Sequence, residues 1–372
     1  MAFYAEKDFT EDETVLEAAN QVMQGNLSLH WYNAKTERMK GRPSNMDRGL
    51  TYQDLDVGSY GYTSIPENVR NSQSMVSRGS EKVGKLPDMG YVVNRKSDVW
   101  SDNVGELYEE SKARRWVPAV DVPWKTLRTE PLPPDLESAY AQLYTLLQEC
   151  QIVSLDFPSR WVSLINQDFL EQKSFMCAQM LDASRLLEAF RKRALYGGTG
   201  LGRASISAEQ GLKEWLWADR FPQGSVSINL SLAGLLLVIY RQVAAFAKTK
   251  VDRSIMGYAM QDAGRQVAYG LGQLRYHLQH RPLEVAAMEE YVDDTEHSMV
   301  GILGSPELLE PMIIICGGGL EKDQVDKGRA ATARFIKLVV SEYMERLASA
   351  GLAGHSRRSR IPALIDRIQS PA

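Results

Sequence analysis

Cysteine and histidine are scarce in this chain, which has three cysteines and five histidines among 372 residues. Cys150, Cys177 and Cys316 are too few and too widely spaced for a disulfide framework or a thiolate zinc site. We therefore expect a reducing, cytoplasmic environment. The histidines lie mostly among polar residues, and no local Ser-His-Asp or Cys-His signature accompanies them, so the sequence identifies no nucleophilic catalytic group.

An excess of positive charge is also missing. The formal net charge is -4 and the pI is about 5.9, which argues against nucleic acid as the main partner. The N-terminal residues are partly acidic and do not form a basic region followed by an apolar run. No secretory signal is therefore expected.

Strand-like alternation of apolar and polar residues is almost absent between residues 104 and 350. That region has helical periodicity instead, which predicts an all-α fold. Before it, residues 14–38 favour a helix, and the Gly-, Ser- and Tyr-rich stretch that follows is typical of a long, largely irregular arm. We divide the chain into an N-terminal helix and arm (1–103), a helical bundle (104–350) and a basic tail (351–372).

Both ends of the chain have residues that predict contacts. Aromatic residues in the arm indicate docking on the bundle or on a partner, because a free tail is normally poor in aromatics. The tail contains His355 and several arginines, and we expect it either to be solvated or to contact an acidic partner. The tyrosines of the arm are Tyr52, Tyr60, Tyr62 and Tyr91.

One long apolar run, residues 226–247, raises the question of a membrane span. It contains no carboxylate, but Arg241 and Gln242 interrupt it, and Asn229 with nearby serines makes its first half mixed. A buried core helix fits this composition better than a span, and we expect it at the centre of the bundle.

Two helical segments, eighty residues apart, contain the same pattern, Asp-Ala-x-Arg. A repeat of this kind favours two related helix pairs about a pseudo-twofold axis. The pattern resembles the paired Asp-Glu-x-Arg-His motifs of the ferritin-like di-iron carboxylate oxygenases, in which the Glu and His hold iron. The two copies are Asp182-Ala183-Ser184-Arg185-Leu186 and Asp262-Ala263-Gly264-Arg265-Gln266.

The resemblance covers residues 106–270 and is strongest to bacterial ferritin-like proteins related to arylamine N-oxygenases. It implies a ferritin-like helical bundle whose metal site is degenerate, because most of the implied ligand positions lack donor atoms. Glu149 alone keeps a carboxylate there, and in an apolar pocket it would tend to be protonated. The implied ligand positions are Glu149, Ala183, Leu186, Ala233, Ala263 and Gln266.

The charged residues of the two repeats can serve the fold without metal. We expect them to form ion pairs between helices or to cap nearby polar groups, although a buried pair is often worth little net stability. They are Asp182, Arg185, Asp262 and Arg265.

The resemblance implies a metal-free, non-catalytic subunit, without a cofactor, that binds a protein partner. We expect a homo- or hetero-oligomer with a ferritin-like chain such as a catalytic di-iron oxygenase, and neither nucleic acid nor a membrane as partner. Two alternatives stay open. One is an oxygenase or oxidase that uses no metal, or iron or manganese at an atypical site. The other is a small-molecule binding protein that uses the pocket at the vestigial ligand positions.

An acidic helix face with one histidine is a further candidate site. Glu289, Asp293 and His297 are four residues apart, and Asp294 adds an oxygen, so a surface divalent ion is an alternative. A solvated acidic face is the main interpretation.

Overall fold

The computed structural model describes residues 13–29, 31–32, 43–47, 49–55, 65–69, 75–76, 78, 80, 88–129 and 131–363. Strand-type pairing among these residues is limited to two isolated bridges, and the prediction of an all-α fold is confirmed. The helical elements are α1 (Glu13–Met23), α2 (Tyr52–Leu55), α3 (Lys96–Val99), α4 (Val104–Ala113), α5 (Pro118–Asp121), η1 (Trp124–Arg128), α6 (Pro134–Val162), α7 (Leu170–Tyr196), α8 (Ile206–Leu216), α9 (Phe221–Ser225), η2 (Val226–Leu232), α10 (Ala233–Phe246), α11 (Lys250–His280), η3 (Pro282–Glu284), α12 (Val285–Leu303), α13 (Pro306–Gly317), α14 (Lys322–Ala350) and η4 (His355–Arg357).

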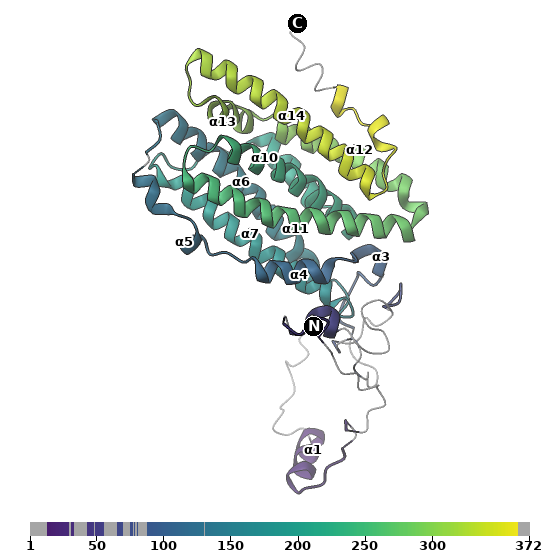
Figure 1. The fold of residues 1–372 in the computed structure, drawn as a ribbon. Coiled ribbons are helices and arrows are strands. Elements are labelled where there is room, and N and C mark those ends of the chain that lie inside the picture. The colour runs from purple at the N-terminus through teal and green to yellow at the C-terminus, as the bar shows by residue number, and fades with distance from the viewer. Residues whose placement is uncertain are drawn as a thin grey trace.

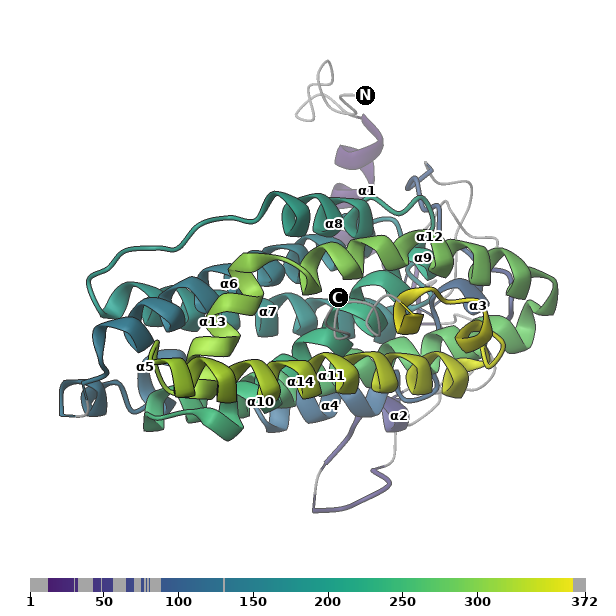
Figure 2. The ribbon, with the colours of Figure 1, turned by 90° about the horizontal axis from the view of Figure 1, so that it is seen from above.

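Two helical hairpins form the centre of the bundle (Figure 1). α6 packs along α7, α10 packs along α11, and contacts between α7 and α11 join the two hairpins. α14 covers α10 and α11, while α13 contacts both α6 and α14. The long helices run side by side when the bundle is seen from above (Figure 2). The two Asp-Ala-x-Arg repeats therefore lie on neighbouring helices of the inner layer.

Local sequence signals account for the ends of the long helices. Pro134 occupies the first turn of α6, where its missing amide hydrogen costs no helical hydrogen bond. Thr249 caps α11 by accepting a hydrogen bond from the amide of Asp252 at 3.0 Å. Gly351 ends α14 with a φ of 114°, a left-handed conformation that glycine adopts without strain. These signals position the central helices along the chain.

The long apolar run belongs to the continuous helical segment Phe221–Phe246, formed by α9, η2 and α10. By length and composition this segment could cross a membrane, but 72% of its most apolar part is buried inside the bundle. Leu235 and Leu236 are fully buried, whereas Leu237 is only half-buried. Its burial confirms the prediction of a core helix. The segment Pro282–Gly317 would count as a second candidate only if α12 and α13, bent by 52°, formed one span.

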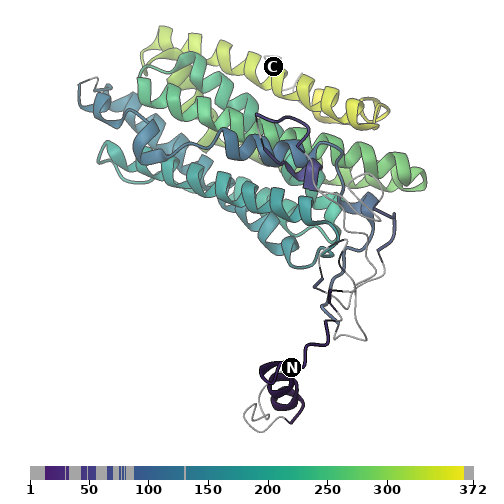
Figure 3. The ribbon, with the colours of Figure 1, turned by 60° about the horizontal axis from the view of Figure 1, so that its bottom comes forward.

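The N-terminal helix is shorter than the 14–38 range predicted from the sequence. α1 ends at Met23, and Gly25 then adopts a φ of 85°, which breaks the helix. Residues 33–42 lie outside the part of the chain that the structure describes. α1 stands apart from the bundle (Figure 3), and its apolar residues Leu16 and Met23 are exposed.

Two tyrosines of the arm dock on the bundle, as their aromatic character predicts. The hydroxyl of Tyr52 lies 2.5 Å from that of Ser174 on α7, and its ring meets Tyr108 of α4 edge-on. Tyr91 is buried, with the ammonium group of Lys173 4.9 Å from its ring centre. Tyr60 and Tyr62 lie outside the described residues.

Candidate functional site

A closed group of four charged side chains links α7 to α11. We call Asp182, Arg185, Asp262 and Arg265 the ion quartet. Arg265 donates hydrogen bonds to both aspartates, at 2.8 Å to Asp182 and at a shorter distance to Asp262. Arg185 donates to Asp182, and its Nη2 lies 3.6 Å from Oδ2 of Asp262. The structure thus brings together the charged residues of the two repeats, and all four are buried.

Burial dominates the electrostatics of the ion quartet. Together with the charge of Asp182, burial raises the pKa of Asp262 to about 6, against the opposing effect of Arg265. Burial also raises the pKa of Asp182, although Arg265 and Arg185 act in the other direction. Trp116 stabilises the carboxylate of Asp262 by donating its Nε1–H to Oδ2 at 3.0 Å. With two carboxylates and two guanidinium groups, the ionised quartet has no net charge to bury.

The implied ligand positions on α7, α10 and α11 are buried but offer almost no metal donors. The space between the helices contains Tyr240 of α10, whose hydroxyl accepts a hydrogen bond from Nε2 of Gln151 on α6 at 3.0 Å. Its ring lies 5.8 Å from that of Phe190 on α7. Burial, reinforced by Cys150 and Asp262, raises the pKa of Tyr240 far above its usual value, so the hydroxyl is neutral. The buried positions are Ala183, Leu186, Ala233, Ala263 and Gln266.

A second polar contact within the bundle links α7 to the π-helix η2. Gln179 donates a hydrogen bond from Nε2 to Oδ1 of Asn229 at 2.9 Å. Gly270 of α11 lies close by, where an added Cβ would be 3.0 Å from the backbone of Asn229. The pair consists of neutral amides, which are weak ligands for a redox metal.

Glu149 does not join the ion quartet. It is half-buried on α6, and burial together with the charges of Glu209 and Glu307 raises its pKa to about 7. Those two glutamates lie on α8 and α13, whereas the ion quartet lies between α7 and α11. The side chain expected as the surviving metal ligand is therefore influenced by glutamates of α8 and α13, and among the described residues it forms no ion pair with the ion quartet.

A pocket of about 590 Å³ opens between α4 and α7, beside the ion quartet. We call it the α4–α7 pocket. Ser111, Asp182 and Arg185 are buried and form its floor, while Cys177 and Leu181 are exposed at its rim. Its lining residues are Tyr108, Ser111, Lys112, Arg115, Gln167, Leu170, Lys173, Ser174, Cys177, Ala178, Leu181, Asp182 and Arg185.

Part of the acidic face of α12 is paired with arginine, while Asp294 and His297 on the same face are exposed. Arg358 of the C-terminal segment pairs with Asp293 and, at 3.1 Å, with Glu289. His297 is paired separately with Glu214 of α8 at 2.8 Å. The basic tail, as far as residue 363, thus contacts an acidic helix of its own chain. Buried His355 adds a 2.7 Å contact to Glu296.

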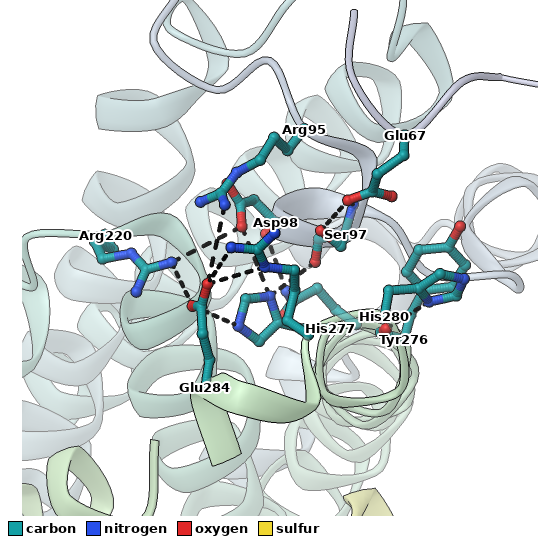
Figure 4. Close-up of polar contacts among 11 residues, drawn as sticks. Glu67, Arg95, Ser97, Asp98, Arg220, Tyr276, His277, His280 and Glu284 are labelled. Atoms are coloured by element: carbon teal, nitrogen blue, oxygen red, sulfur yellow. Dashed lines mark hydrogen bonds and ion pairs between the residues drawn. The ribbon is translucent and has the colours of Figure 1, made fainter. Parts of the chain in front are cut away.

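Another polar group ties the arm to the end of α11 (Figure 4). Nδ1 of buried His277 lies 3.0 Å from the carbonyl oxygen of Ser97, and Nε2 lies 3.4 Å from Oε2 of Glu284. Burial lowers the pKa of His277. Although burial opposes the shift, hydrogen bonds from Arg220 and Arg281 lower the pKa of Glu284 to about 2. Arg220 and Arg281 already neutralise the Glu284 carboxylate. The contact of His277 with Ser97 holds α3 against α11, so we assign this group a structural role.

Comparison with known proteins gives a match in structure alone. No family model and no curated protein matches the chain. One similar solved structure is an R2-like ligand-binding oxidase with aerobically reconstituted Mn/Fe cofactor after a long soak. It has a TM-score of 0.52 and 19% identity, over 66% of this chain and 91% of that one. An R2-like ligand-binding oxidase with aerobically reconstituted metal cofactor after photoconversion has a TM-score of 0.52 and 18% identity, over 66% and 93%.

These matches show that the chain has the ferritin-like helical bundle fold, which the two repeats predict. An identity of 18–19% establishes the fold and leaves activity to be argued from the residues.

The prediction that this chain has no cofactor is contradicted by the same matches, because both similar structures hold a metal cofactor. The donors at the implied site of this chain do not fit a carboxylate-bridged metal pair. Ala183, Leu186, Ala233 and Ala263 supply no ligand atom, and Glu149 lies elsewhere. Across the described ranges, no group of three or more His, Cys, Asp or Glu side chains is arranged to hold a metal ion.

Proposed function

We propose that this chain is a small-molecule-binding protein on the ferritin-like oxidase fold, and that it takes its ligand in the α4–α7 pocket. The observation that carries the proposal is a pocket of about 590 Å³ whose floor includes Asp182 and Arg185 of the ion quartet. This volume lies within the range of roughly 300–1,000 Å³ that is usual for ligand pockets. The likeness to ligand-binding oxidases supports the small-molecule and oxidase alternatives over a subunit that binds only protein.

The pocket proposed here differs from the one expected at the vestigial ligand positions. Ala183 and Ala263 are buried, and the hydrogen-bonded Tyr240 lies among the four central helices. The α4–α7 pocket lies between α4 and α7. The residues of the repeat that line it are Asp182 and Arg185. Polar groups there stand beside apolar ones such as Leu170 and Leu181, a mixture typical of sites for organic molecules.

Filling the pocket tests this proposal. Ala178→Trp places an indole against the pocket wall, whereas Ala330→Trp puts the same group on the exposed surface of α14 as a control. Small organic molecules that raise the melting temperature of the wild type should lose that effect with Ala178→Trp and keep it with Ala330→Trp. The proposal fails if no molecule stabilises the wild type, or if stabilisation persists unchanged in Ala178→Trp.

A partner-binding role is the second candidate, supported by the exposed apolar residues in and after α1. Leu16, Met23 and Trp31 are exposed by 44%, 85% and 67%, which is unusual for side chains of this size in one short segment. We propose that this segment packs on a second ferritin-like chain, in the first instance another copy of this one. The remaining expectations, a cytoplasmic location and a relation to arylamine N-oxygenase-like proteins, belong to the same proposal.

Sedimentation of the purified protein tests this second role. A Leu16→Lys/Met23→Lys variant should shift the chain from dimer to monomer, since charge would replace the apolar contact. A double change on the α14 surface, Lys337→Gln/Leu338→Lys, is the control and should leave the mass unchanged. A monomeric wild type would contradict self-association through α1.

A further inference from the structure

Charge is strongly unbalanced around the α4–α7 pocket. Its lining includes four cationic side chains and a single carboxylate, that of Asp182. This carboxylate already accepts hydrogen bonds from Arg185 and Arg265. The lining therefore has positive charge that no lining group neutralises, which favours a negatively charged occupant.

The two lysines of the lining are already engaged. Lys112 pairs with Glu109 at 2.7 Å and lies over the ring of Tyr108. Lys173 donates its Nζ–H to the carbonyl oxygen of Ile165 at 2.8 Å, and burial lowers its pKa. Neither lysine offers its full charge to a ligand.

The two arginines of the lining keep unused hydrogen-bonding capacity. Arg185 is about nine-tenths buried, and its Nε–H has no hydrogen-bond partner within the described part of the chain. The ring of Trp116 lies 5.6 Å from the Arg185 guanidinium carbon, and Arg115, the residue before Trp116, lines the same pocket as Arg185. Arg115 is exposed and forms no ion pair with the residues that the structure describes. A buried N–H group without an acceptor lowers the stability of the folded state. An anion bound at this end of the pocket would accept a hydrogen bond from Nε of Arg185 and remove that loss.

An apolar strip extends from this arginine end along α7. Leu181, Ala178 and Leu170 recur at helical spacing on the face that lines the pocket, and Tyr108 of α4 lies near its far end. From Arg185 to Leu170 the helix rises about 22 Å at 1.5 Å per residue. The strip is therefore long enough to contact an organic group attached to the anion.

We infer, on the basis of the proposed function, that the α4–α7 pocket takes an amphipathic organic anion. Its charged oxygens bind Nε of Arg185 and the guanidinium group of Arg115, and its apolar body lies along Leu181 and Ala178. Arg185 keeps its hydrogen bond to Asp182 through Nη2, so binding leaves the ion quartet intact. An acid with a compact apolar body, such as an aryl or medium-chain carboxylate, has the required chemistry.

Matched pairs of acids and neutral amides test the anion requirement by calorimetry on the full chain. The probes are benzoate, 1-naphthoate and decanoate, their three amides, and inorganic phosphate. At least one carboxylate should bind ten or more times as tightly as its amide, and its affinity should fall as salt rises. Amides that bind as tightly as acids would overturn the inference and leave the proposed function standing. Binding by none of the organic probes would remove the support for both.

Variants then test which cations contact the anion. Arg115→Gln should raise the dissociation constant of the best carboxylate about fivefold, because it removes a charge-assisted contact from an exposed position. Lys112→Gln, on the same rim, should change it less than about twofold, since that ammonium is already paired. Equal effects of the two changes would overturn the assignment of the arginine end. Arg185→Gln should weaken binding more than either, provided that its circular dichroism matches the wild type.

Phosphate separates an organic ligand from an adventitious ion. The inference requires phosphate to bind at least ten times more weakly than the best carboxylate, because phosphate cannot use the apolar strip. Ala178→Trp should abolish carboxylate binding and leave any phosphate binding at the arginines. Phosphate that binds as tightly as the acids would mean an adventitious ion only, and the inference would fail.

Discussion

The ion quartet and the α4–α7 pocket share Asp182 and Arg185 but differ in charge balance and access. In the quartet, two carboxylates meet two guanidinium groups, and all four side chains are buried. In the pocket, four cations face one carboxylate that is already paired, and the rim is open to solvent. The same pair of residues thus completes a closed structural network on one side and forms the floor of a candidate site on the other. Charge balance, more than the number of charged groups, separates a structural cluster from a candidate binding site.

Removing one carboxylate from the ion quartet should have the largest effect on stability, and it tests whether the quartet depends on balanced charge. Asp262→Ala leaves Arg265 and Arg185 buried with one acceptor between them and removes the partner of Trp116. The free energy of unfolding, measured with urea, should fall by about 3–5 kcal/mol, the usual cost of an orphaned buried charge. A loss below about 1 kcal/mol would show that the quartet is not closed.

The matched control replaces the whole quartet by apolar residues of similar size. It leaves no charge unpaired, so it should be closer to the wild type in stability than Asp262→Ala is. The four changes are Asp182→Leu, Arg185→Met, Asp262→Leu and Arg265→Met.

Tyr240→Phe tests the neutral part of the same interior. The change removes the acceptor of the hydrogen bond from Gln151 and should cost about 1–2 kcal/mol in urea unfolding, because the buried amide loses its partner. Tyr196→Phe, at the exposed end of α7, is the control and should have almost no effect. If both changes are neutral, Tyr240 only fills space between the helices.

Glu149 supplies the contrasting case of a carboxyl group whose pKa is raised by burial and, to a smaller extent, by nearby carboxylates. Its pKa rises from 4.5 to about 7 on folding, so stability is lost as the pH rises through this interval. Glu149→Gln should therefore match the wild type at pH 4 and exceed it by about 1 kcal/mol at pH 8, a figure reduced for its half-exposed position. The control is Glu310→Gln on the exposed face of α13. A variant that is less stable at pH 8 would contradict the sign of the effect.

Lys192→Gln should give the smallest change in the free energy of unfolding among these variants. This lysine pairs with Glu188 on the exposed side of α7 and directly precedes the buried Arg193. Urea unfolding should change by less than about 0.5 kcal/mol, as is usual for solvated pairs four residues apart. A change as large as that of Asp262→Ala would mean that burial does not decide the strength of ion pairs on this helix.

The sequence was sufficient to predict the bundle and the ion quartet, because both follow from patterns within single helices. The Asp-Ala-x-Arg repeats mark one face of α7 and one of α11, and the apolar run in α10 requires a core position. No pattern in the neighbouring sequence indicates that Trp116 contacts Asp262 or that Tyr240 contacts Gln151. Their roles depend on how the segment after α4 packs against α11 and how α10 packs against α6, which no spacing along the chain reveals.

Long-range packing also gives Glu149 and the acidic face of α12 neighbours that the sequence did not indicate. Glu149 lies in the expected helix, but a turn of α6 by one residue moves a side chain about 100° around the axis, enough to face α8 and α13 instead. Glu289 and Asp293 do share a face of α12, yet Arg358, 65 residues beyond Asp293, binds them. The α4–α7 pocket is likewise formed by helices whose contact the sequence alone does not specify.

The pairing within the ion quartet also has a consequence for the order of folding. Each helix contains an aspartate and an arginine three residues apart, Asp182 with Arg185 and Asp262 with Arg265, which can pair as soon as that helix forms. The α6–α7 and α10–α11 hairpins therefore approach one another with their charges already balanced. Docking of the two hairpins then buries paired ions instead of isolated ones, which reduces the desolvation cost of assembling the core.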